Sequence, residues 1–172
     1  MAERQGDPGL DPAADRAIVC LWYDGTAEEA ARFYAATLPD SAIRQVHRSP
    51  IDYPAGKAGD VLVVMMTLCG IPYILMNGGP EYKPNLTYSL QVHTDTQEET
   101  DRLWDALTAD GGTAGECGWC QDRWGYSWQI TPRALTRGMA DPDPAAASRV
   151  LQAMMTMSRI DIAAIEAARR GD

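Results

Sequence analysis

Two cysteines, Cys117 and Cys120, stand three positions apart in a segment that also contains three of the five tryptophans. The C-x-x-C spacing occurs in redox centres and in halves of zinc sites. A redox pair normally opens a helix, whereas aromatic residues favour a strand, on which the two sulfurs would point to opposite faces. A zinc site would need a second pair, and Cys20 and Cys69 are isolated from each other in the sequence. We therefore expect these cysteines to serve packing.

Acid–base chemistry has few candidates. His93 lies two residues before Asp95, whose carboxylate could orient an imidazole that acts as a general base. Glu81, in a loop rich in glycine and proline, is the other side chain that we consider for acid–base catalysis. The alternative for His93 is a position at the end of a strand without a chemical role. Beyond these two candidates, the catalytic residues are unknown.

Polar side chains alternate with apolar ones along two predicted strands, at Ser89 and Gln91 and again at Ser127 and Gln129. Alternate residues of a strand share one face. Polar groups beside aromatic rings are what a small organic ligand needs for orientation and contact area. The tryptophans could instead fill the core, and the polar face could be the one that meets water. If this face lines a cavity, the predicted ligand-binding residues are Trp22, Ser89, Gln91, Trp119, Ser127 and Gln129.

The chain contains a duplication. A strand over 18–23 is followed by the capping-box pattern T-x-E-E at 26–29 and by a helix that ends near residue 37. A strand over 86–93 is followed by the same pattern at 96–99, and a shift of 70 residues superposes the two helices. Each copy then has strands joined by a glycine-containing turn. We predict two similar strand–helix–strand units.

A helical segment follows the second copy. Asp143-Pro144 is typical of a helix start, and the apolar residues after it predict two short helices or one bent helix. Their apolar face needs a partner, which is either the domain's own sheet or a second subunit, and on this basis we expect a homodimer. The predicted domains are a disordered tail over 1–16, a first module over 17–80, a second module over 81–135 and a helical extension over 136–172.

Composition excludes several classes of partner. The net charge of −9 disfavours nucleic acid and anionic membrane surfaces. The most apolar run, over 61–76, is interrupted by Gly70 and Pro72, so it predicts a hairpin and not a membrane span. With no recognisable export signal at the N-terminus, we expect a cytoplasmic protein whose cysteines are reduced.

The chain resembles the vicinal oxygen chelate superfamily, which includes glyoxalase I, bleomycin-resistance proteins and extradiol dioxygenases. More narrowly, it is similar to the PhnB-like branch, often labelled as a 3-demethylubiquinone-9 3-methyltransferase domain. The resemblance extends over residues 17–167. It is carried by the segments LWYDG at 21–25, NGGP at 77–80, CGW at 117–119, DRWG at 122–125 and SWQI at 127–130.

This resemblance implies an α+β fold of two βαβββ modules around a shared cavity, plus the C-terminal helical tail. In metal-using relatives each module supplies one ligand from its first strand and one, usually Glu, from its last. Counted along the repeat, these positions hold Val19, Ile74, Ser89 and Gln129. Because a divalent ion prefers His nitrogens or carboxylates, we expect no metal site and no cofactor.

We therefore predict a metal-independent protein that binds an aromatic or amphipathic small molecule. The alternative is an enzyme of the same superfamily, with non-standard metal ligands or with acid–base catalysis by His93 or Glu81. A further alternative is an interaction protein whose cavity is filled by its own Trp and Met side chains. Methyl transfer is disfavoured, because the glycine-rich turn that usually binds S-adenosylmethionine is missing from the sequence.

Overall fold

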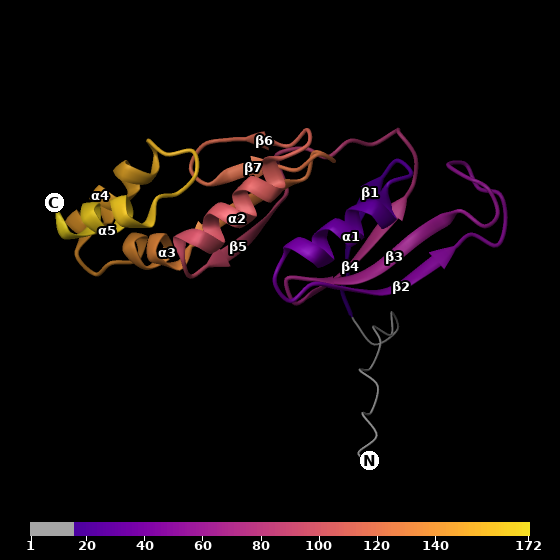
Figure 1. Ribbon diagram of the computed structural model, residues 1–172, viewed down its shortest axis with the longest axis horizontal. Coiled ribbons are helices and arrows are strands. Elements are labelled where there is room, and N and C mark those ends of the chain that lie inside the picture. Colours follow the sequence, from indigo (N-terminus) through magenta and orange to yellow (C-terminus); the bar gives the residue numbers. More distant parts are fainter. Residues whose placement is uncertain (1–15) are drawn as a thin grey trace, which may run out of the picture. The chain divides into compact units, whose positions relative to one another are not determined.

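The computed structural model describes residues 16–172, so the predicted tail lies outside the described residues except for its last one. The chain forms two compact units, of which the first ends at Lys83 and the second begins at Pro84 (Figure 1). No helix in the described range is long and apolar enough to cross a membrane.

The first unit is one four-stranded sheet with a helix on one face. Its strands lie in the order β1-β4-β3-β2, with β1 parallel to β4 and the remaining pairs antiparallel. The elements are β1 (Val19–Tyr23), α1 (Ala27–Thr37), β2 (Ala42–Arg48), β3 (Val61–Leu68) and β4 (Ile71–Asn77). The expected hairpin turn at Cys69 and Gly70 is present, and both residues have the positive φ that a two-residue turn of this kind requires.

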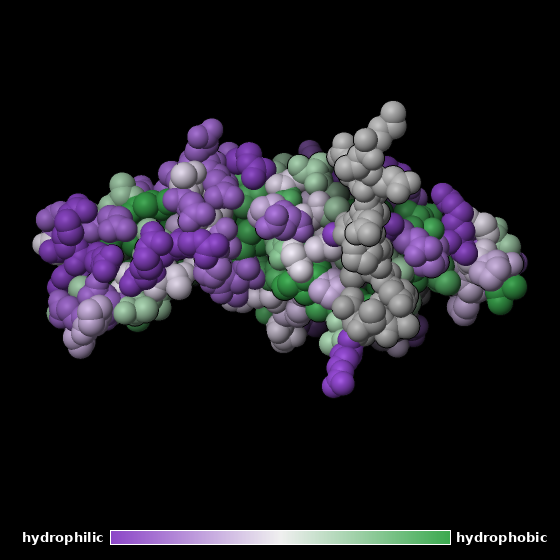
Figure 2. Space-filling model, turned by 90° about the horizontal axis from the view of Figure 1, so that it is seen from below, coloured by the Kyte–Doolittle hydropathy of each residue, from purple (hydrophilic) through white to green (hydrophobic). Residues whose placement is uncertain are grey.

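Helix α1 packs closely on this sheet because the face that it buries is small. Ala27, Ala30 and Ala31 are fully buried, and the Tyr34 hydroxyl meets that of Tyr23 at 3.0 Å. Alanine also has the highest helix propensity. Apolar residues reach the surface of this unit as well, and they are seen as green patches in the right half of Figure 2.

The second unit repeats the plan. Its strands lie in the order β5-β8-β7-β6, again with a parallel pair of first and last strands. The elements are β5 (Ser89–Thr94), α2 (Gln97–Thr108), β6 (Thr113–Ala114), β7 (Trp119–Gln121) and β8 (Ser127–Pro132). The predicted duplication of an α+β unit is confirmed.

The turn between β7 and β8 is built around a buried carboxylate. One oxygen of Asp122 accepts the backbone N–H groups of Trp124 at 2.9 Å and Tyr126 at 3.0 Å, and the other accepts the Trp128 indole N–H at 2.8 Å. Asp122 is 2% exposed. A carboxylate that accepts three hydrogen bonds is a strong organiser of a buried turn. Asp122 therefore has a structural role in the turn between β7 and β8.

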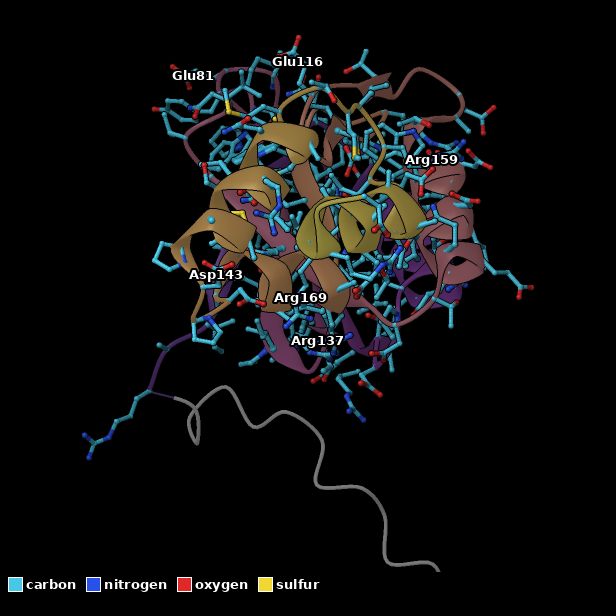
Figure 3. The ribbon with its side chains drawn as sticks, turned by 90° about the vertical axis from the view of Figure 1, so that its left-hand side faces the viewer. Glu81, Glu116, Arg137, Asp143, Arg159 and Arg169 are labelled. Atoms are coloured by element: carbon cyan, nitrogen blue, oxygen red, sulfur yellow. The ribbon has the colours of Figure 1, made fainter. Side chains whose placement is uncertain are left out.

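Three helices follow the second sheet: α3 (Arg133–Met139), α4 (Pro144–Met154) and α5 (Ile162–Arg170). The two predicted helices are confirmed as α4 and α5, and Asp143 caps α4 by accepting the Ala145 N–H at 3.0 Å. Helix α3 was not predicted, since it starts directly after β8 without a polar cap. In Figure 3 the C-terminal helices α4 and α5 lie nearest the viewer.

The helices share one apolar cluster, formed by Leu135, Val150, Ile160 and Ile165. The chain itself thus covers most of the apolar face for which we expected a partner. An ion pair of 2.6 Å between Arg169 and Asp141 also links α5 to the segment before α4. The Asp143 N–H and Arg169 lower the pKa of the Asp141 carboxyl below its ordinary value.

The segment between α4 and α5 is fastened to the second sheet. The N–H groups of Cys117 and Gly118 donate to the carbonyls of Met157 and Ser158, both at 2.7 Å. Gly118 has a φ of +81°, and an added Cβ would lie 2.9 Å from the Ile130 carbonyl oxygen, so glycine is needed there.

A second set of contacts ties the same segment to α2. The Gln97 amide donates to the Ile160 carbonyl at 3.1 Å and accepts the Ile162 N–H at 2.8 Å. Arg159 lies 3.3 Å from Asp101 and 3.2 Å from Asp105. The helical extension is therefore an integral part of the second unit.

Candidate functional site

The second unit contains a pocket of about 440 Å³ between the face of its sheet that is turned away from α2 and the C-terminal helices. This volume is within the range of sites for small organic molecules. The sheet side and the 115–118 turn supply half of the wall, and α3, α4 and their connection supply the other half. The lining residues are Gln91, Cys117, Trp119, Gln129, Thr131, Leu135, Thr136, Met139, Ala140 and Met154.

Strand parity decides which side chains reach the pocket. Val92, Trp128 and Ile130 are buried on the side of the sheet that faces α2. Their neighbours Gln91 and Gln129 point to the opposite side, because successive strand residues alternate between faces. The odd-numbered face of β5 and β8 is therefore the one on which the pocket lies.

Three pocket residues form one row across the sheet. Gln129 on β8 is the ladder partner of Gln91 on β5 and of Trp119 on β7. The Gln129 amide nitrogen donates to the Ser89 hydroxyl at 2.8 Å, which orients this amide. Within residues 16–172, the Gln91 amide and the Trp119 indole N–H make no hydrogen bond. The row thus offers polar groups to an occupant of the pocket.

The remaining side chains of the wall are uncharged, and some of them are flexible. Thr131 and Thr136 add hydroxyl groups, while Met139 and Met154 contribute flexible thioether side chains that adapt to an apolar surface. No Asp, Glu, Lys, Arg or His is part of the lining. The arrangement suits binding through hydrogen bonds and apolar contact.

The two cysteines of the C-x-x-C pattern are separated by the fold. Cys117 lies in a turn with a φ of +57° and lines the pocket, so our placement of it in a strand was wrong. Cys120 lies in β7 and is buried on the opposite face. Burial, and then the negative charge of Asp122, raise the pKa of the Cys120 thiol from 9.0 to about 12. All four cysteines are free, and the different positions and surroundings of Cys117 and Cys120 do not resemble a C-x-x-C redox pair at a helix start.

The other predicted ligand-binding residues lie outside this lining. Ser89 contacts it indirectly through Gln129. Ser127 lies two residues before Gln129 on the same strand but is 2% exposed, and its hydroxyl has no hydrogen-bond partner among the described residues. Trp22 belongs to the first unit, where its indole N–H donates to the Gly79 carbonyl at 2.8 Å and its ring meets Tyr82 edge-on.

The two catalytic candidates belong to different units. The His93 Nδ1 lies 3.3 Å from the Thr131 carbonyl oxygen, and Asp95 forms an ion pair of 3.2 Å with Arg133. Glu81 is exposed in the first unit, after the loop that begins at Gly78. Among residues 16–172, the His93 ring is paired with the Thr131 backbone carbonyl and with no carboxylate, and Glu81 has no partner that would orient it.

That loop does not offer a nest of free amides to an anion. The N–H groups of Gly78 and Gly79 both donate to the Tyr23 carbonyl, at 3.0 and 3.3 Å. The Trp22 ring lies over Gly78, where a Cβ would come within 2.1 Å of it. Gly78 therefore leaves room for the Trp22 ring, and the loop has a structural role.

The register pairs the last-strand positions with first-strand residues other than the ones that the repeat had indicated. The ladder partner of Ile74 is Cys20, and that of Gln129 is Gln91, where the repeat had indicated Val19 and Ser89. The loop before the helix is one residue longer in the first unit, which shifts its strand against the helix.

These paired residues, Cys20 with Ile74 and Gln91 with Gln129, carry a thiol, an isoleucine side chain and two amides. This donor set does not fit a divalent ion that prefers imidazole and carboxylate ligands. Across residues 16–172 no group of three His, Cys, Asp or Glu side chains could hold a metal ion.

Comparison with known proteins identifies the family of the chain. A sequence model described as 3-demethylubiquinone-9 3-methyltransferase matches residues 15–131. The chain belongs to this family. No match was found among curated proteins. The structure is similar to that of a PhnB protein from Bacillus cereus, described under the same methyltransferase name, with 28% identity and a TM-score of 0.61 over 69% of this chain and 99% of that one.

A second solved structure, of protein PA1353 from Pseudomonas aeruginosa, is 19% identical with a TM-score of 0.52 and covers 69% of this chain and 97% of that one. It supports the fold alone. The predicted resemblance to the vicinal oxygen chelate fold and its PhnB-like branch is confirmed. The family match ends at residue 131, before α3, although we had extended the resemblance to residue 167.

Sequence reasoning missed the half of the pocket wall that comes from this extension. Leu135, Thr136, Met139 and Ala140 belong to α3 and its C-terminal cap, and Met154 belongs to α4. The only available signal was the apolar face of the helices, which we had expected to pack on either the domain's own sheet or a second subunit.

Proposed function

We propose that the protein is a metal-independent binder of an aromatic or amphipathic small molecule, held in the pocket of the second unit. The observation that supports this most is the row of Gln91, Gln129 and Trp119 at the base of an uncharged pocket. Amides and an indole can orient and stack a ligand, but they cannot readily take up or release protons near neutral pH. We also propose a cytoplasmic location, with which four free cysteines are consistent.

We do not carry over the methyl transfer in the family's name. The Gly-rich turn after a strand that usually binds the nucleotide part of S-adenosylmethionine is missing from the sequence, and both sheets here have the βαβββ plan. Acid–base catalysis by His93 is not supported by a carboxylate partner in the described part of the chain, since Asp95 is paired with Arg133. Binding is the function that the pocket's side chains favour.

A thermal-shift screen of the purified full chain with a panel of small aromatic compounds tests the proposal. A ligand present at a hundred times its Kd stabilises the folded state by about 2.7 kcal/mol. We expect at least one compound to raise the Tm of the parent and to do so much less in Gln129→Leu. Gln152→Leu, an exposed change on α4 outside the pocket, is the matched control. A panel without any hit would refute binding.

Metal analysis tests the other half of the proposal. The purified protein should contain no stoichiometric Ni, Zn, Mn or Fe, and a chelator should leave the Tm shift of a hit unchanged. Stoichiometric metal, or loss of the shift on chelation, would favour the alternative of a metal-dependent enzyme.

We also retain the homodimer as a proposal. Leu151 on α4 and Met155, the C-cap residue of this helix, remain exposed, at 40% and 64%. Large exposed apolar side chains on one helix are suited to a subunit contact. The double variant Leu151→Glu with Met155→Glu should sediment as a monomer where the parent sediments as a dimer; equal masses for the two proteins would contradict this interface.

A further inference from the structure

The wall of the pocket is free of formal charge, and this restricts the ligand. Its polar groups are two amides, two hydroxyls, an indole N–H and a thiol. A charged group that enters such a site loses its hydration without gaining a counter-ion, which is costly. The net charge of −9 opposes anions further. Figure 3 shows the nearby charged residues Glu116 and Arg137 at opposite edges of this end of the molecule.

The sheet side of the pocket presents a polar edge. Gln91 and Gln129 are ladder partners on adjacent strands, which lie about 4.8 Å apart. Ser89 holds the Gln129 amide, while the Gln91 amide is free to rotate. Two neighbouring amides present donors and acceptors side by side. They are complementary to a ligand edge that carries one donor next to one acceptor, such as a carboxamide or lactam.

The opposite side of the pocket is apolar. Leu135 and Met139 come from α3 and Met154 from α4, and Trp119 flanks the amide pair at the end of the row. Aromatic and thioether surfaces favour contact with a flat ring. The extension begins after the family match ends at residue 131, so this apolar half is an addition to the matched segment.

We infer that the ligand is an uncharged, flat amphiphile with a carboxamide-like edge, and that α3 and α4 determine its selectivity. This rests on the proposed function, because it assigns a ligand class to the same pocket. The amide row binds the polar edge, and the side chains of the extension cover the ring.

Calorimetry of the full chain at pH 7 with 2-naphthamide and 2-naphthoate tests the ligand class, since these probes share a ring and differ in the charge of the edge. We expect 2-naphthamide to bind at least about tenfold more tightly. Equal or tighter binding of 2-naphthoate would overturn the neutral-ligand inference and leave the proposed function standing. Absence of binding by these probes and by the whole aromatic panel would refute both.

Variants locate the site. Gln129→Glu keeps the size of the side chain, adds a negative charge and should weaken 2-naphthamide binding by about tenfold or more. Gln152→Glu adds the same charge on exposed α4 and should bind as the parent does. If Gln129→Glu does not fold, Gln91→Glu, on the exposed part of the row, replaces it. An unchanged affinity in the folded pocket variant would overturn the assignment.

Selectivity is tested by Met139→Ala and Met154→Ala. Each should reduce the preference of the protein for 2-naphthamide over benzamide, because the lost thioether contacts the ring and not the amide edge. A preference that stays at the parent value in both variants would refute the role of the extension.

Discussion

The two units have the same order and direction of strands, yet they differ in almost every polar contact. Position for position, the row Gln91, Gln129 and Trp119 in the second unit corresponds to Cys20, Ile74 and Met65 in the first. The strand residues that face the helix are mostly apolar in both units, apart from polar groups such as Asn77 and Thr94 that bond to the helix. The two units therefore share a largely apolar layer between sheet and helix, and they differ most on the other face.

The helix starts show the same divergence. In the second unit Thr96 accepts the Glu99 N–H at 3.1 Å, as the capping box predicts. In the first unit Thr26 makes no such bond, contrary to our prediction, and the Asn77 side chain accepts the Ala27 N–H at 2.9 Å. The residue that corresponds to Asn77 is Pro132, whose side chain cannot accept a hydrogen bond.

The largest difference that mutation should reveal concerns the hairpin turns. Asp122→Ala leaves two buried backbone N–H groups and the Trp128 indole without an acceptor, and we expect a loss of about 3–5 kcal/mol. The corresponding turn at Cys69 and Gly70 depends on backbone geometry, so hydrogen exchange should increase in the second unit alone. Asp110→Asn, which removes an exposed partner of Arg123, should change stability by less than about 1 kcal/mol.

The helix caps should rank next. Asn77→Ala removes both the cap and the bond that its amide donates to the Val61 carbonyl at 2.9 Å, at a cost of about 2 kcal/mol. Thr96→Ala should cost about 1 kcal/mol, and Thr26→Ala less than either. Urea unfolding measures all three. A Thr26 variant as unstable as the Thr96 variant would contradict the assigned caps.

Alkaline pH should destabilise the second unit through Cys120. Because its folded pKa is raised to about 12, the thiol favours folding fully below its ordinary pKa and loses that contribution as the pH rises from 9.0 towards 12. The slope is at most about 1.4 kcal/mol per pH unit. The corresponding residue of the first unit, Met66, does not titrate. Urea midpoints of Cys120→Ala between pH 9 and 11 should fall less steeply than those of the parent, and parallel curves would contradict the cause.

The smallest expected effect is the difference in stability between Ser89→Ala and Ser127→Ala, which change two serines on the same face of the second sheet. Ser89→Ala removes the acceptor of the Gln129 amide and should cost about 1 kcal/mol. Ser127→Ala removes a buried hydroxyl without a partner and should leave stability unchanged or raise it slightly. The corresponding residues in the first unit, Ile18 and Pro72, carry no polar side chain. Chemical denaturation of both variants measures the difference, and a Ser127 variant that loses more than the Ser89 variant would show a missing contact.

Much of the fold was predictable. Strand alternation, the two T-x-E-E patterns and the Asp143-Pro144 start identify local elements, and the repeat identifies two similar units. The acceptor for α1 could not be predicted, because Asn77 reaches Ala27 from 50 residues away in sequence. The role of Asp122 could not be predicted either, because a carboxylate near aromatic residues gives the same sequence pattern in a binding site and in a structural turn.

What the sequence by itself determined was the order of elements, the duplicated plan and the neutral amides at Gln91 and Gln129, because propensity and periodicity are local properties. What only the tertiary structure decided was which residues share a surface. Cys117 and Cys120 are close in sequence and lie on opposite faces, whereas Gln129 and Met154 come from different elements and line one pocket. Strand register and helix docking set these neighbours through contacts between distant parts of the chain, and a local pattern does not encode them.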